Sequence, residues 1–148
     1  MLQVAILVVI AWLSISYSLI HERAETEHLS QLSGDVAATN FLNYRQSLVN
    51  YRIANPTATG TIAYASLTVP TGYIQDSRWT NLITGGTLYV YSTVSPPPMM
   101  INATYQKSGK YIMVGIKLAS GDLSGPRGVV TASLPGAIPT GAIVYIGG

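Results

Sequence analysis

The segment Phe41-Leu42-Asn43-Tyr44-Arg45-Gln46-Ser47-Leu48-Val49-Asn50-Tyr51 carries the pattern that decides the fold. Its large apolar side chains extend a series with spacings of four and three residues: Ala37, Phe41, Tyr44, Leu48 and Tyr51. In an α-helix this spacing places them all on one face. Asn55-Pro56 predicts the end of the helix, because the residue before a proline avoids helical geometry. The stripe therefore predicts either a helix face packed on a sheet, which we favour, or a short coiled-coil seam.

The second interpretation makes four side chains of the stripe candidates for contact with a partner protein: Phe41, Tyr44, Leu48 and Tyr51. A seam of only two heptads is short for a stable coiled coil. The packing interpretation is favoured because a single sheet has a face that must be covered, and the sequence shows no other long helix to cover it.

Upstream of this helix, residues 2–20 contain no charged side chain. As a helix they would extend about 28 Å, close to the roughly 30 Å of a membrane hydrocarbon core. No Lys or Arg precedes Arg23, and no A-x-A-like cleavage site is visible, which favours an uncleaved anchor over a signal peptide. Gly34 and Asp35 predict a kink or helix restart, because glycine is unfavourable within a helix and aspartate is a good N-cap.

The chain is therefore expected to have three parts: a transmembrane anchor over residues 1–20, a juxtamembrane helical collar over 21–34 and a head over 35–148. The collar and Asp35 hold four acids against the single base Arg23. The positive-inside rule gives acids little weight and Arg23 opposes it, but the pattern still favours an N-in, C-out orientation. In a bacterium this predicts a single-pass inner-membrane protein with its head in the periplasm.

Beyond Gly60 the chain is rich in Thr, Val, Ile, Tyr, Gly and Pro, which are strand and turn residues. Six strands are expected, at about residues 61–69, 87–93, 99–106, 110–118, 127–133 and 142–146. The short connection Lys107-Ser108-Gly109 predicts an antiparallel hairpin between the third and fourth. The expected fold class is α+β: a transmembrane helix that continues into an amphipathic stalk helix packed on an antiparallel β-sheet.

Charge and composition exclude several classes of chemistry. Only 9% of the 148 residues are charged and the formal net charge is +2, but residues 36–148 hold seven bases against Asp76 and Asp122. The absence of cysteine excludes disulfides, cysteine-based zinc sites and a thiol nucleophile. The dipeptide Gly109-Lys110 is not a P-loop, because Tyr111 stands where Ser or Thr must hold magnesium.

Other candidate sites do not require metal binding or catalysis to explain them. His21, Glu25 and His28 would share one face of a helix, but three side chains in a line seldom converge on one metal ion. The head contains no histidine to activate a serine, and Asp76 and Asp122 each lie beside a turn residue. We therefore expect no catalytic residues, no metal and no cofactor, and we expect the protein not to be an enzyme.

The predicted hairpin combines bases with aromatic side chains: Tyr105, Lys107, Lys110 and Tyr111. Such a surface could follow a phosphate backbone. The remaining bases are spread along the chain and no nucleic-acid-binding module is visible, so solvated surface or a protein contact is the preferred interpretation.

The order of parts, an apolar N-terminal helix running into an amphipathic helix and then an antiparallel sheet, resembles a type IV pilin. The segment 41–51, followed by Asn55-Pro56 and Trp79-Thr80-Asn81, resembles the start of type IVb pilin-related heads. Over its whole length the chain is most similar to the PilM family of type IVb thin pilus biogenesis. It lacks the basic leader, the early glutamate and the C-terminal cysteine pair of a type IVb pilin.

This resemblance implies a non-enzymatic, inner-membrane-anchored component of thin pilus assembly that acts in pilin transport or in the basal body. Its expected partners are pilins and other inner-membrane assembly proteins, and a homo-oligomer is an open alternative. A second function remains open: a periplasmic binding module that presents a basic, tyrosine-rich head to a pilin, a glycan or a nucleic acid.

Overall fold

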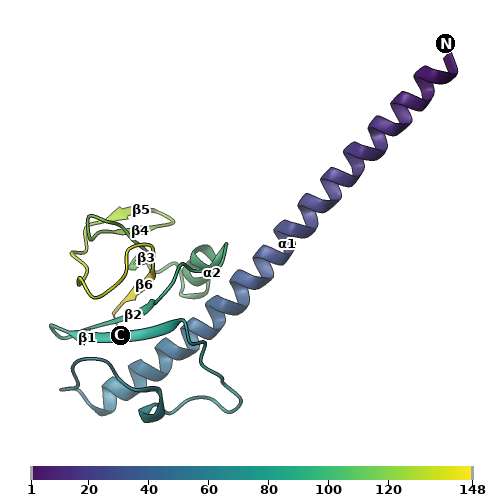
Figure 1. Ribbon diagram of the computed structural model, residues 1–148. Helices are drawn as coiled ribbons and strands as arrows, with labels where there is room; N and C mark the ends of the chain where they lie inside the picture. Colours follow the sequence, from purple (N-terminus) through teal and green to yellow (C-terminus); the bar gives the residue numbers. More distant parts are fainter. Residues whose placement is uncertain (1, 148) are drawn as a thin grey trace.

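The computed structural model describes the backbone of residues 2–147 and the side chains of residues 25–147. The protein is α+β, with one long helix, a short second helix and a six-stranded sheet (Figure 1). Helix α1 (Leu2–Ala54) ends just before Pro56, as its sequence predicts. The predicted anchor at residues 1–20 falls outside the described side chains. In the part of the chain that is described, no helix combines the length and apolar character needed to cross a membrane.

The predicted break at Ser33-Gly34-Asp35 is wrong, because α1 runs through these residues as one helix. Gly34 is buried where α1 meets helix α2 (Met100–Lys107). A Cβ atom at position 34 would lie 2.6 Å from the carbonyl oxygen of Pro98 and 2.9 Å from the backbone nitrogen of Met100. The glycine therefore permits close packing between the two helices and does not interrupt the first.

The sheet has the strand order β1-β2-β6-β3-β4-β5, and every neighbouring pair is antiparallel. The strands are β1 (Trp79–Thr84), β2 (Thr87–Ser92), β3 (Val114–Lys117), β4 (Leu123–Gly125), β5 (Gly128–Val130) and β6 (Ile143–Ile146). The strands predicted at 87–93, 110–118, 127–133 and 142–146 correspond to β2, β3, β5 and β6, with shorter bounds.

Two predicted strands are wrong. Residues 99–106 form most of α2, so the predicted hairpin at Lys107-Ser108-Gly109 does not exist. The buried residues of this segment, Met100, Thr104 and Tyr105, follow helical spacing, and the helix packs against α1 and β3. Residues 61–69 contain the short 3-10 helix η1 (Tyr64–Ser66) and no strand, although the adjacent Gly60 forms one bridge with Ile83.

The core has two layers, one on each face of the sheet. The first lies between the sheet and α1 and includes Phe41, Leu48, Trp79 and Val90. The second is closed by the loop that precedes β6, with Leu134 and Ile138 packed on Leu123 and Val144. Strand β6 serves both layers, because its alternate side chains point to opposite faces.

Candidate interaction surface on α1 and α2

The stripe predicted from the sequence is a packing face of the head. Phe41, Tyr44 and Leu48 are buried, which confirms the packing interpretation for these three residues. Phe41 meets Trp79 edge to face, with 5.3 Å between the ring centroids. Tyr51 is half-buried beside the same core. Of the four predicted partner-contact residues, only Tyr51 keeps an appreciable part of its surface outside the head.

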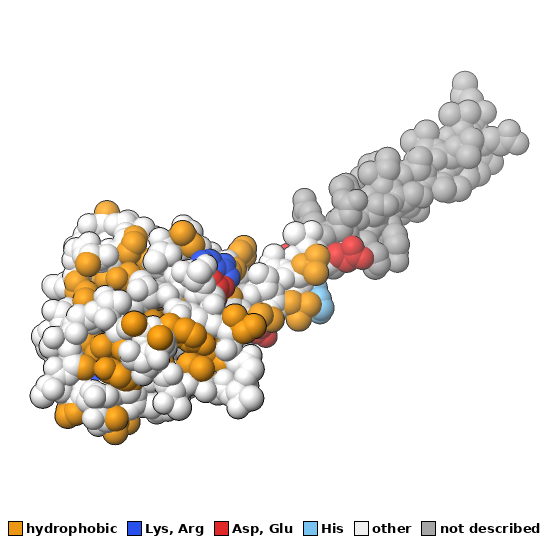
Figure 2. All heavy atoms as spheres, turned by 60° about the horizontal axis from the view of Figure 1, so that its bottom comes forward, with side chains coloured by type: hydrophobic (Ala, Val, Ile, Leu, Met, Phe, Trp, Pro, Cys, Tyr) orange, Lys and Arg blue, Asp and Glu red, His pale blue; other side chains and the backbone are white. Residues whose placement is uncertain are grey.

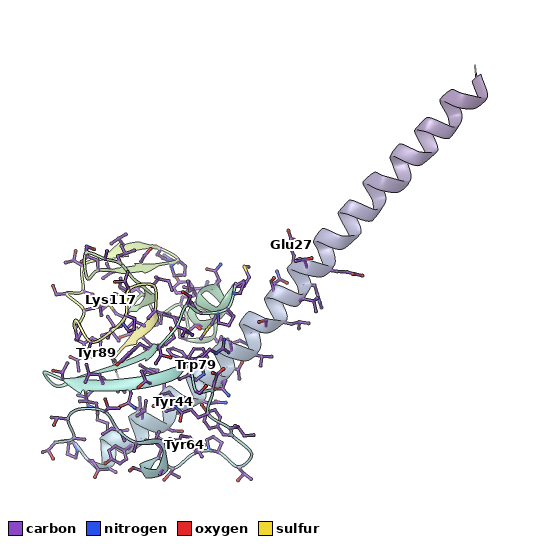
Figure 3. The ribbon with its side chains drawn as sticks, viewed as in Figure 1. Glu27, Tyr44, Tyr64, Trp79, Tyr89 and Lys117 are labelled. Atoms are coloured by element: carbon purple, nitrogen blue, oxygen red, sulfur yellow. The ribbon has the colours of Figure 1, made fainter. Side chains whose placement is uncertain are left out.

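Polar side chains within this face attach α1 to the chain that follows it. The Asn40 Oδ1 atom accepts hydrogen bonds from Trp79 Nε1 (2.9 Å) and from the Tyr73 hydroxyl (3.1 Å), while its Nδ2 donates to the Ile74 carbonyl (2.8 Å). Burial raises the pKa of the Tyr73 hydroxyl above its ordinary value. The loop before β1 is therefore fixed to the C-terminal third of α1 (Figure 3).

The two aspartates of the head do not form a catalytic pair. Asp76 contacts Arg78 with 2.5 Å between Oδ2 and Nη2, and hydrogen bonds from the guanidinium lower the pKa of this carboxyl group. Asp122 accepts a hydrogen bond from the Ser120 hydroxyl just before β4. They lie at different ends of the strand order, before β1 and before β4, so the turn interpretation describes both residues.

Both tyrosines that suggested nucleic-acid binding make contacts inside the protein. Tyr105 is buried, and its hydroxyl oxygen accepts a hydrogen bond from Arg127 Nε at 2.7 Å. Tyr111 stacks on Tyr145 with 5.0 Å between centroids, and the Arg45 guanidinium lies 4.1 Å from the centroid of the Tyr145 ring.

The predicted collar and the first residues of the predicted head carry a surface that the sequence reasoning missed. Leu29, Leu32 and Val36 lie at i, i+3 and i+7 on α1 and are 66%, 50% and 70% exposed. We call these three residues the outer stripe. Figure 2 shows hydrophobic side chains along this part of the helix, where it leaves the head. The spacing was visible in the sequence, but polar neighbours between the three residues concealed it.

The outer stripe is distinct from the packing face that begins at Ala37. Successive residues of a helix are rotated by about 100°. Val36 is 70% exposed while the next residue, Ala37, is buried against the core. The helix therefore presents one apolar face to the sheet after residue 37 and another to solvent before it.

Acidic side chains border the outer stripe. Glu25 lies one turn before Leu29 on the same face, and Asp35 lies beside Val36. Residues 25–35 contain three acids, one histidine and no Lys or Arg. Glu25 and His28 are exposed, whereas the third residue of the metal candidate, His21, falls outside the described side chains. Within the described residues, no group of three or more His, Asp or Glu side chains could hold a metal ion.

The α1–α2 junction lies at the head end of the outer stripe. Asp35 Oδ1 is 3.6 Å from Lys107 Nζ, and both side chains remain partly exposed. Hollows of about 360 and 320 Å³ lie on either side of this ion pair. The first is lined by Val36, Thr39, Asn40 and Asn43 together with the pair, and the second by residues that include Gln31, Met99 and Asn102. The stripe and hollows form a surface suited to another protein's side chains.

The comparisons with known proteins identify the family. The family model named PilM matches residues 7–146, nearly the whole chain. The chain belongs to the PilM family. This membership confirms the family resemblance found in the sequence and supports a pilus-related role. No curated protein matches the sequence.

Two crystal structures of proteins named PilM are similar to this chain. The structure from Escherichia coli B7A is 21% identical, covers 76% of this chain and 89% of its own, and has a TM-score of 0.59. The structure from Pseudomonas aeruginosa 2192 is 32% identical, covers 77% of this chain and 95% of its own, and has a TM-score of 0.46. The first of these PilM structures shows that the fold is shared.

Proposed function

We propose that this PilM-family protein is a non-enzymatic, inner-membrane-anchored component of type IVb thin pilus assembly. In this proposal its head stands in the periplasm and its helix α1 contacts other assembly proteins. The family match supports involvement with a pilus. The single observation that carries the proposed contact role is the outer stripe, an aligned row of exposed apolar side chains on α1 beside the head.

Isolated apolar side chains are common on protein surfaces, but an aligned row on a helix is typical of protein contact. The buried face of the same helix is already occupied by the sheet, so the outer stripe is available for a partner. The acids of the head hold structural contacts with Arg78 and Ser120, which supports a contact function. The uncharged stretch at residues 2–20 supports the anchor.

The proposal is tested by complementing a deletion strain with the full chain carrying Leu32→Asp. We expect pili to be lost although the protein accumulates normally, because a charge in the middle of the contact would have to be desolvated. Ile53→Asp is the matched control. Ile53 lies near the C-terminal end of the same helix and is 76% exposed. Normal piliation in the deletion strain itself would refute a role in assembly.

The location of the head is tested separately with a C-terminal alkaline phosphatase fusion to the full chain. A periplasmic head predicts an active phosphatase and a silent cytoplasmic reporter at the same position. The opposite pattern would place the head in the cytoplasm. Intact-mass analysis should find Met1 or Leu2 at the N-terminus, and removal of fifteen to thirty residues would refute an uncleaved anchor.

A further inference from the structure

We propose that the outer stripe binds one amphipathic helix of another membrane-anchored protein, and that Lys or Arg residues border the apolar face of that helix. The inference rests on the proposed assembly function and specifies the partner's chemistry. The two helices would lie side by side along α1, between Glu25 and the hollow at the α1–α2 junction.

The shape of the surface favours a helix over an extended segment or a loop. Leu29, Leu32 and Val36 follow the a-d-a spacing of a helix seam. From the first to the third, the backbone rises about 10 Å, two helical turns, which matches the repeat of a partner helix. Residues 25–33 are almost all exposed on α1, so the head leaves room beside the stripe.

The acidic residues beside the outer stripe predict which residues border the partner's apolar face. Glu25 extends the stripe by one turn, and Asp35 flanks Val36, whereas residues 25–35 contain no Lys or Arg. A partner with Lys or Arg beside its apolar residues would meet Glu25 at one end of the contact and Asp35, which Lys107 neighbours, at the other. A second copy of this chain in the same membrane would run parallel and place Glu25 against Glu25, which is unfavourable. The charge pattern therefore favours a different protein over self-association.

The junction with α2 gives the contact a defined end. The hollow of about 360 Å³ begins at Val36 and continues along α1 past Thr39 to Asn43. The Asp35–Lys107 pair at its edge is long, at 3.6 Å, and both side chains are partly exposed. Such a pair contributes little to stability, so Asp35 can accept a guanidinium or ammonium group from a partner at small cost.

The test places a photoreactive amino acid at Leu32 of the full chain in a pilus-producing strain, with the same group at Ile53 as the control position. We expect Leu32 to cross-link to a membrane protein and peptide mass spectrometry to locate the bond on a helix that carries Lys or Arg beside apolar residues. Glu25→Lys should lower the yield about three- to tenfold, because it replaces attraction by repulsion. Changing the nearest partner base to Glu should restore the yield of the Glu25→Lys variant.

Three results would overturn the inference: a cross-link to a second copy of this chain, a cross-link to a segment without bases, or no cross-link from Leu32. The proposed function fails by a different result, namely normal piliation of the deletion strain. A strain that needs the protein for pili but yields no cross-link at Leu32 would therefore retain the function and reject this docking surface. Because the Leu32 side chain is exposed on α1, circular dichroism of the Leu32 variant should match that of the wild type.

Discussion

Two adjoining regions of α1 share the same spacing of apolar residues and have opposite surroundings. Residues 37–51 present Phe41, Tyr44 and Leu48 to the sheet, where they are buried, whereas residues 25–36 present Leu29, Leu32 and Val36 to solvent. Hydrophobic periodicity identifies a helix face in both regions. Only the presence of the sheet and α2 determines which face becomes core. The first face should therefore control stability, and the second should control association.

The largest expected effect distinguishes the two regions directly. Phe41→Ala should reduce the free energy of unfolding by about 3–5 kcal/mol, because it opens a cavity beside Trp79. Leu32→Ala should change it by less than about 0.5 kcal/mol. Denaturant unfolding of the two variants measures the difference. Equal effects would mean that the outer stripe is also part of a folded core.

The second prediction concerns Gly34, where the two regions meet. Helix propensity alone predicts that Gly34→Ala stabilises the protein by up to about 1 kcal/mol. The structure predicts destabilisation by about 1–3 kcal/mol, because the new Cβ would lie 2.6 Å from the Pro98 carbonyl oxygen. Ser33→Ala, at the exposed neighbouring position, is the control and should be neutral or slightly stabilising. Thermal unfolding of both variants gives the sign.

The third prediction uses alkaline pH to probe the buried region. Burial raises the pKa of the Tyr73 hydroxyl, which donates a hydrogen bond to Asn40 on α1. A raised pKa in the folded state gives stability that is complete below the unfolded value of about 10 and is lost as pH rises through the folded value. Tyr73→Phe should therefore lose less stability than the wild type between about pH 9 and 11.5.

Urea unfolding across that pH range measures this slope. Leu32→Ser, in the exposed region, should keep the wild-type slope because it removes no titrating group. A Tyr73→Phe variant with an unchanged slope would show that its hydroxyl does not contribute to the alkaline loss of stability.

The smallest expected effect belongs to the exposed ion pair at the junction. Lys107→Ala should cost less than about 0.5 kcal/mol, because the Asp35–Lys107 contact is long and open to solvent. Denaturant unfolding at low and high salt measures it. A loss above about 1 kcal/mol would show that this pair organises α2, and Asp35 would then not be free to contact a partner.

The fold could be predicted where one residue class dominates a regular pattern. The packing face of α1 was predictable because Phe41, Tyr44 and Leu48 are large and regularly spaced. Strand β1 was missed although Gly85-Gly86 follows it, a two-residue hairpin signal in which both glycines have positive φ. Asn81 hid the alternation between Trp79 and Ile83, because it is a buried amide that binds the Tyr44 hydroxyl and the Ile62 backbone.

Other features depend on contacts between distant residues and could not be predicted locally. Residues 99–106 were predicted to form a strand because Met100, Ile101 and Tyr105 are apolar, but packing of this segment against α1 and β3 stabilises a helix. Gly34 was predicted to interrupt the helix. The contact that explains this glycine is with the Pro98 backbone, which lies 64 residues further along the chain. The outer stripe was missed for a local reason, since polar residues separate Leu29, Leu32 and Val36 in the sequence.

The position of β6 has a consequence for how the head is made. Within the described sheet, this strand alone pairs with both β2 and β3 and so joins the β1–β2 hairpin to β3–β4–β5. Until residues 143–146 have emerged from the ribosome or the export channel, the two parts of the sheet cannot join. Residues of β1, β2 and α2 can cover the packing face of α1 earlier, and Ile143 and Tyr145 complete this core layer last. The strand that completes both core layers is therefore the last of the six strands to be synthesised.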